Sequence, residues 1–116
     1  MYYDPSCRES KTTEQWRTIL RQAARYISDR GHCKHAFQQG ASVCAIGAMR
    51  LAAGVSLSYS LNTKDAPESY LQAIAALNRY LLKTRTKYIT IPEWNDAPKR
   101  TAADVICALL TAAEAL

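Results

Sequence analysis

The strongest constraint on the fold is an apolar stripe at helical spacing between residues 13 and 30. Its members recur at steps of three and four residues, which places them on one face of a helix. They are Trp16, Ile19, Leu20, Ala23, Ala24 and Ile27. Thr12, with Gln15 three residues later, predicts a capping-box start, and Gly31 predicts an end in a left-handed turn.

Three later segments also predict helices. The second runs over residues 43–53 and ends at Gly54, and its many alanines make it slim enough for close packing. The third opens with Asp65 as its cap and Pro67 in its first turn, and Thr101 caps the fourth. The apolar face of the third comprises Tyr70, Leu71, Ile74, Leu77, Leu81 and Leu82. That of the fourth comprises Val105, Ile106, Leu109, Leu110, Ala113 and Leu116.

The stretches between these helices predict loops and short extended segments. Residues 36–43 suit a small hairpin that turns at Gly40, and residues 88–91 suit an extended segment stopped by Pro92. The sequence therefore predicts a mainly α fold, a compact bundle of about four helices with a small β-hairpin or extended segment. We expect one domain over residues 1–116, with 1–11 as a loosely ordered N-terminal arm.

Composition narrows the class of protein. Of 116 residues, 48% are hydrophobic and 22% are charged, which is typical of a globular domain and argues against disorder. No apolar run is long enough for a membrane helix, and the first residues lack the pattern of a secretory signal. We expect a cytoplasmic protein of a bacterial host, with no membrane partner. Its four cysteines, Cys7, Cys33, Cys44 and Cys107, are expected to be thiols.

Two segments carry a resemblance to a known family. The first is Arg30-Gly31-His32-Cys33 followed by the helix start Cys44-Ala45-Ile46-Gly47-Ala48, and the second is Trp94-Asn95-Asp96-Ala97-Pro98 before the last helix. Over residues 15–116 the chain resembles a family of small uncharacterised proteins, a domain of unknown function, from actinobacteria and their phages. The resemblance implies a phage or prophage origin and carries no activity with it. His32 and His35 are not part of the family pattern.

The densest group of reactive side chains lies after the first helix. Cys33, His35 and Cys44 are residue types that bind zinc, but their spacing matches no closed zinc motif, so we expect no metal and no cofactor. If Ser42 caps the second helix, Cys44 lies in its first turn, where the amides and the dipole lower the pKa of a thiol.

A cysteine-dependent enzyme is therefore one hypothesis for this group. Cys44 or Cys33 would be the nucleophile and His35 the base, oriented by Asp29. The alternative is that these cysteines are small buried apolar residues.

Basic residues suggest a second class of function, nucleic-acid binding. Arg17, Arg21 and Arg25 step by four along the first helix. Lys83, Arg85 and Lys87 alternate in the segment that ends at Tyr88. Such stripes neutralise phosphates, and a tyrosine stacks on bases. The alternative is a solvated helix face and a charged loop, because a net charge of +5 is a small excess.

The segment Trp94-Asn95-Asp96 allows a third class, protein binding. Its residues are either a rigid corner with Trp94 in the core, which we favour, or an exposed anchor for a partner. Neither a phosphate-binding loop nor a nucleophile elbow is present. The sequence thus favours a non-enzymatic, phage- or prophage-type accessory protein that binds a host protein through a surface patch. A nucleic-acid-binding regulator and a small cysteine-dependent enzyme are the alternatives, and a homodimer is compatible with all three.

Overall fold

The computed structural model describes residues 14–57, 66–84 and 89–115. These segments form five helices and a two-stranded antiparallel hairpin, which confirms the mainly α fold. The elements are α2 (Gln15–Arg30), β1 (Gln38–Gln39), β2 (Ser42–Val43), α3 (Ala45–Ala53), α4 (Glu68–Thr84), α5 (Ile91–Asp96) and α6 (Ala102–Glu114). The predicted arm at 1–11, the caps at Thr12 and Asp65, the loop over 58–64, and Arg85, Lys87, Tyr88 and Leu116 lie outside the described residues.

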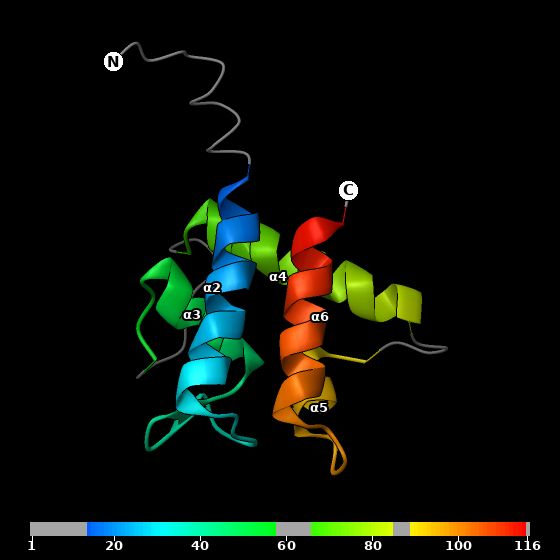
Figure 1. The fold of residues 1–116 in the computed structure, drawn as a ribbon. Coiled ribbons are helices and arrows are strands. Elements are labelled where there is room, and N and C mark those ends of the chain that lie inside the picture. The colour runs from blue at the N-terminus through cyan, green and yellow to red at the C-terminus, as the bar shows by residue number, and fades with distance from the viewer. Residues whose placement is uncertain (1–13, 58–65, 85–88, 116) are drawn as a thin grey trace.

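α2 is at the centre of the packing. It runs antiparallel beside α6, and α4 crosses behind both helices (Figure 1). α2 also packs on α3, so its buried face meets three other helices. That face is Ile19, Leu20, Ala23, Ala24 and Ile27, as the periodicity predicts. The start of the helix differs, because Glu14 is its N-cap and makes no side-chain capping bond.

The hairpin is confirmed, with Gly40 in its turn at φ 62°. Val43 was expected in a helix, but it belongs to β2 and pairs with Gln38. Its amide also donates to the Gly31 carbonyl, which fastens the hairpin to the end of α2. The expected helix therefore begins two residues later, with Cys44 rather than Ser42 at its N-cap.

α5 corrects the prediction of an extended segment that ends at Pro92. Thr90 and Glu93 form a capping box, in which the Thr90 hydroxyl accepts from the Glu93 amide and the Glu93 carboxylate accepts from the Thr90 amide. Pro92 falls in the first helical turn, where an amide hydrogen has no intrahelical acceptor, so proline starts this helix instead of stopping a strand. The bundle accordingly has five described helices where four were expected.

Small residues replace several leucines of the predicted core. α4 buries Ala73 and Ala76, and α6 buries Ala108 and Ala112, where these helices pack together and on α2. Three leucines expected in the core are exposed instead: Leu71, Leu82 and Leu110. Each directly follows a buried residue and so points about 100° away from it around the helix.

Candidate functional site

Two segments that lie far apart in the sequence meet at one end of the bundle. The loop after α2, the start of α3 and the short helix α5 gather there, at the bottom of Figure 1. The junction is held by Asn95, whose side chain is 1% exposed. The two segments on which the family resemblance rests are therefore neighbours in space.

All four hydrogen-bonding positions of the Asn95 amide are occupied. Its Nδ2 donates to the Cys33 carbonyl at 3.1 Å and to Asp96 Oδ1 at 2.9 Å. Its Oδ1 accepts from the Ala45 amide at 3.0 Å and lies 2.8 Å from His32 Nε2. Because a carbonyl oxygen only accepts, His32 Nε2 must carry a hydrogen. Asn95 thus joins the loop, α3 and α5, and has no capacity left for a ligand.

Asp96 and Lys34 tie the same loop to the end of α5. Asp96 Oδ1 accepts from the His35 amide at 2.9 Å, and Asp96 Oδ2 lies 3.5 Å from His35 Nδ1. The Lys34 ammonium donates to the Ala97 and Pro98 carbonyls at 2.7 and 3.1 Å. His35 has a left-handed backbone with φ 67°, which turns its exposed ring toward Asp96. The carboxylate that faces this ring is Asp96, whereas the expected Asp29 is an exposed residue of α2.

Cys44 caps α3 with its sulfur. Its Sγ accepts from the Gly47 amide at 3.2 Å, and its own amide donates to the Phe37 carbonyl. Gly47 is required at its position, because an added Cβ would lie 2.1 Å from the Phe37 carbonyl oxygen. The start of α3 and the loop therefore touch backbone to backbone.

A cavity of about 370 Å³ opens between these elements, within the size range of ligand pockets. We call it the Asp96 pocket. It is lined by His35, Ala36, Phe37, Cys44, Ile46, Pro92, Asn95 and Asp96. Phe37, Ile46 and Pro92 carried no functional signal in the sequence, because only the tertiary fold makes their apolar side chains line a cavity.

The charges in the pocket follow from its hydrogen bonds. Burial opposes ionisation of Asp96, but hydrogen bonds from the His35 amide and the Asn95 side chain, with the charges of His35 and His32, hold its pKa below the usual value. Burial raises the pKa of Cys44 and the charge of Asp96 adds to this, although the Gly47 and Ile46 amides act in the opposite direction. Burial likewise raises the pKa of Cys33, with contributions from Cys44 and Asp96.

These shifts contradict the expected activation of Cys44 by the start of a helix. A thiol whose pKa is raised stays protonated at neutral pH and is a weak nucleophile. Cys44 and His35 do line one pocket, but Cys44 as a residue is 7% exposed and its sulfur serves as the cap of α3. The arrangement favours a structural thiol over a catalytic one.

The structure gives no metal centre at this junction. Among residues 14–57, 66–84 and 89–115, no group of three or more His, Cys, Asp or Glu side chains is placed to hold an ion. Cys33 and Cys44 are free buried thiols, and their neighbours are backbone groups: Cys33 Sγ lies 3.4 Å from the Ala36 carbonyl oxygen.

Trp94 lies in the core, 3% exposed, as the corner interpretation expects. Arg100 covers it, with its guanidinium 4.3 Å from the ring centroid and its Nε donating to the Trp94 carbonyl. Trp94 and Asn95 are therefore inaccessible to a partner. Of the three residues proposed for partner binding, only Asp96 reaches the surface, where its side chain is 26% exposed.

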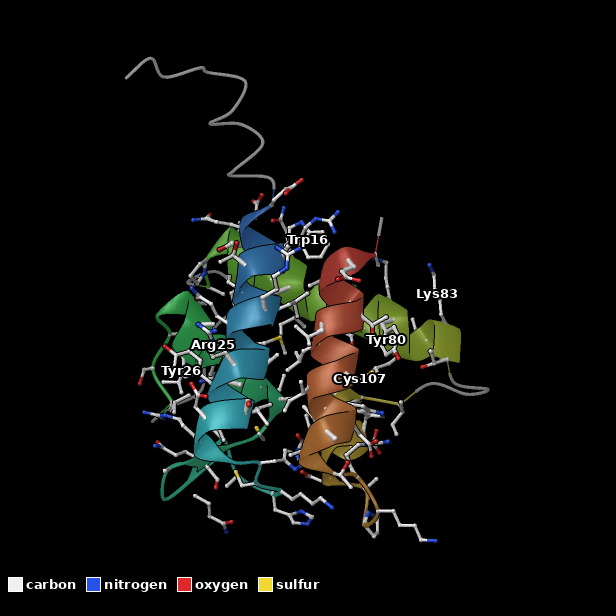
Figure 2. All side chains as sticks on the ribbon, in the orientation of Figure 1. Trp16, Arg25, Tyr26, Tyr80, Lys83 and Cys107 are labelled. Atoms are coloured by element: carbon white, nitrogen blue, oxygen red, sulfur yellow. The ribbon has the colours of Figure 1, made fainter. Side chains whose placement is uncertain are left out.

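The basic residues of the predicted stripes that the structure describes, Arg17, Arg21, Arg25 and Lys83, do not form one continuous surface. Arg17 is used within the fold, because its Nη1 donates to the Ala113 and Ala115 carbonyls at 2.7 and 2.9 Å and so caps the end of α6. Arg25 and Lys83 extend on opposite sides of the molecule in the view of Figure 2. The stripe is thereby reduced to Arg21 and Arg25, both exposed on α2.

A second cavity, of about 440 Å³, lies between α2 and α6. We call it the α2–α6 groove. It is lined by Thr18, Arg21, Gln22, Ala24, Arg25, Ser28, Ile106 and Leu110. Leu110 is 42% exposed, and in the part of the chain that the structure describes no carboxylate forms an ion pair with Arg21 or Arg25. Leu110 was expected in the core from its helical spacing, so nothing in the sequence predicted this surface.

The fold is mainly helical, with one cavity between α2 and α6 and another where the loop after α2 meets α3 and α5. The chain belongs to a family of unknown function, DUF6197, whose model matches residues 11–115. No curated protein and no solved structure shows significant similarity to the chain. In the described segments, no helix is both long and apolar enough to cross a bilayer.

Proposed function

We propose that this protein is a non-enzymatic binding protein that docks an acidic amphipathic helix of a partner protein in the α2–α6 groove. The observation that carries the proposal is an exposed Leu110 beside the exposed Arg21 and Arg25 along one groove, where no carboxylate of the described residues forms an ion pair with them. Apolar side chains of a partner helix would cover Leu110, and carboxylates would pair with the two arginines.

The partner is proposed to be a host protein, and the chain an accessory protein of phage or prophage type that acts in the bacterial cytoplasm. Origin and compartment rest on the sequence resemblance and composition, and the groove supports the binding role alone. The fold weakens the case for nucleic-acid binding, because Arg17 donates to a carbonyl of α6 and Lys83 lies apart from Arg25.

Affinity capture with groove variants tests the proposal. The wild-type chain is used as bait in nuclease-treated host lysate. Crosslinking and mass spectrometry then identify the segment of the captured protein that contacts the bait. Leu110→Asp and the double change Arg21→Glu with Arg25→Glu are expected to lose that protein. Leu82→Asp is the matched control, because Leu82 is 51% exposed on α4 and lies outside the groove.

The proposal is supported if the crosslinked segment is acidic and amphipathic. The captured protein must also be lost with both groove variants and retained with the control. Capture that is insensitive to the groove variants overturns it. Binding that disappears with nuclease treatment favours the nucleic-acid alternative, and crosslinks between two copies of the chain would show a homodimer interface instead.

A further inference from the structure

The Asp96 pocket is separate from the α2–α6 groove. The pocket lies where the loop after α2 meets α3 and α5, whereas the residues that line the groove belong to α2 and α6. Its walls are largely apolar, from Ala36, Phe37, Ile46 and Pro92. We propose that this pocket binds a small organic cation, a primary ammonium group attached to a compact apolar body.

The sign of the ligand charge follows from the charged groups at the pocket. Asp96 supplies a carboxylate, and His35 is charged only when protonated. The other neighbouring basic side chains have partners elsewhere. His32 Nε2 bonds to Asn95 Oδ1, Lys34 donates to carbonyls at the end of α5, and Arg50 stacks on Phe37 while donating to the Ser56 carbonyl. An anionic ligand would therefore be repelled by the negative charge of Asp96, whereas an ammonium group would be attracted to it.

The orientation of the carboxylate is fixed before a ligand binds. Asp96 Oδ1 is held by the His35 amide and Asn95 Nδ2, and Asn95 is itself held by three further partners. This leaves Asp96 Oδ2 as the acceptor open to a ligand, 3.5 Å from His35 Nδ1. A preorganised acceptor beside an apolar cavity loses little entropy on binding, which is how such sites gain affinity.

The apolar part of the ligand follows from the remaining wall. A cavity of about 370 Å³ holds a six-membered ring with a short side chain, and the side chains of Phe37, Ile46 and Pro92 would contact the ring. Cys44 adds a protonated thiol to the floor, which is compatible with an apolar contact. A bare metal ion or ammonium ion would leave these walls uncovered.

Two-dimensional ¹⁵N–¹H NMR titration of the full chain tests the site. Benzylamine, which is protonated at neutral pH, is compared with benzyl alcohol, which has the same ring and no charge. We expect saturable shifts confined to the amides at the pocket, chiefly His35, Phe37, Ile46 and Asp96. Benzyl alcohol should bind about tenfold more weakly or worse, because its neutral hydroxyl replaces the charged ammonium donor to the Asp96 carboxylate.

Two variants and a control complete the experiment. Asp96→Asn should abolish the preference for the amine, and Ile46→Phe should weaken both ligands by filling the cavity while leaving the carboxylate in place. Glu114→Gln removes one negative charge from the exposed end of α6 and should change nothing. Four results would overturn the proposal. With the wild-type chain they are equal binding of the two ligands, chemical-shift changes outside the pocket, and no saturable binding of benzylamine to the folded protein. The fourth is a preference for the amine that survives Asp96→Asn.

Discussion

At the scale of single residues, Asn95 is the most constrained side chain of the junction. It is buried and makes four hydrogen bonds to groups whose positions in the sequence are up to 63 residues away. Asn95→Ala would leave the Ala45 amide and the Cys33 carbonyl without these partners. We expect a loss of about 3 kcal/mol in the free energy of unfolding, because buried polar groups without partners are costly.

Urea denaturation checks this value, with Asn78→Ala as the control. Asn78 is a partly exposed residue of α4, where alanine is a better helix former, so the control should unfold at the same urea concentration or a higher one. Equal destabilisation by the two changes would show that the Asn95 network contributes little.

Asp96 makes the stability of the junction depend on pH. Its hydrogen bonds to the His35 amide and Asn95 hold its pKa below the usual value in the folded chain, so ionised Asp96 stabilises the fold. That stabilisation is complete above the unfolded pKa of about 3.9 and is lost as the pH falls through the lower, folded value. Asp96→Asn should therefore be less stable than wild type at pH 7.

The measurement is the free energy of unfolding of both proteins between neutral pH and pH 2. The difference in unfolding free energy between wild type and Asp96→Asn should stay constant down to about pH 4 and then decrease. A gap that is already absent at pH 7, or that widens in acid, would contradict the assigned direction of the shift.

At the scale of elements, the contact between α3 and the preceding loop depends on Gly47. Gly47→Ala would improve helix propensity by about 1 kcal/mol, but the new methyl group would collide with the Phe37 carbonyl oxygen. Since that atom belongs to the backbone, the loop must move. We expect a net loss of about 2 kcal/mol in unfolding free energy, because overpacking exceeds the propensity gain.

Thermal or chemical denaturation measures this loss, and Gly40→Ala serves as the comparison. Gly40, unlike Gly47, has a positive φ of 62°, and an added Cβ there meets no atom within 4 Å. That change should cost only about 1 kcal/mol through backbone strain. A stabilised Gly47→Ala protein would refute the close approach of the loop.

The pairing of α2 with α6 includes a capping interaction at the end of α6. Arg17→Ala removes the donor to the Ala113 and Ala115 carbonyls and should cost about 1.5 kcal/mol. Arg21→Ala, one turn further along the exposed face, should change stability by less than about 0.5 kcal/mol. If Arg17→Ala and Arg21→Ala change the unfolding free energy by similar amounts, the capping role of Arg17 is wrong.

At the scale of the whole molecule, the thiols report on the intact fold. Cys107 is exposed on α6 (Figure 2), whereas Cys33 and Cys44 are buried. Alkylation followed by peptide mapping should label Cys107 at once, and Cys33 and Cys44 only at the rate of unfolding. Rapid labelling of Cys44 in the native protein would revive the hypothesis of a reactive cysteine.

The periodic helices could be predicted from the sequence, because α2, α4 and α6 each repeat their apolar residues over three or more turns. α5 could not, since its six residues make fewer than two turns and Pro92 is compatible with either a strand end or a helix start. Leu71, Leu82 and Leu110 were also expected in the core, because the sequence does not show how wide the buried face of each helix is.

The candidate site was predictable only in parts. Cys33, Cys44, His35 and Asp96 each stood out by residue type, but their meeting depends on contacts such as His35 with Asp96, 61 positions apart. No local pattern encodes a separation of that length. The same holds for the groove, which exists only because α6 lies beside α2.

The pairing of α2 and α6 has a consequence for the birth of the protein on the ribosome. α2 is synthesised early, but the helix that covers one side of its apolar face is the last one described in the chain. Until α6 has left the exit tunnel, Leu20, Ala24 and their neighbours have an incomplete cover. While residues 31–101 are being synthesised, nascent chains therefore expose part of the apolar face of α2, the kind of surface that chaperones protect.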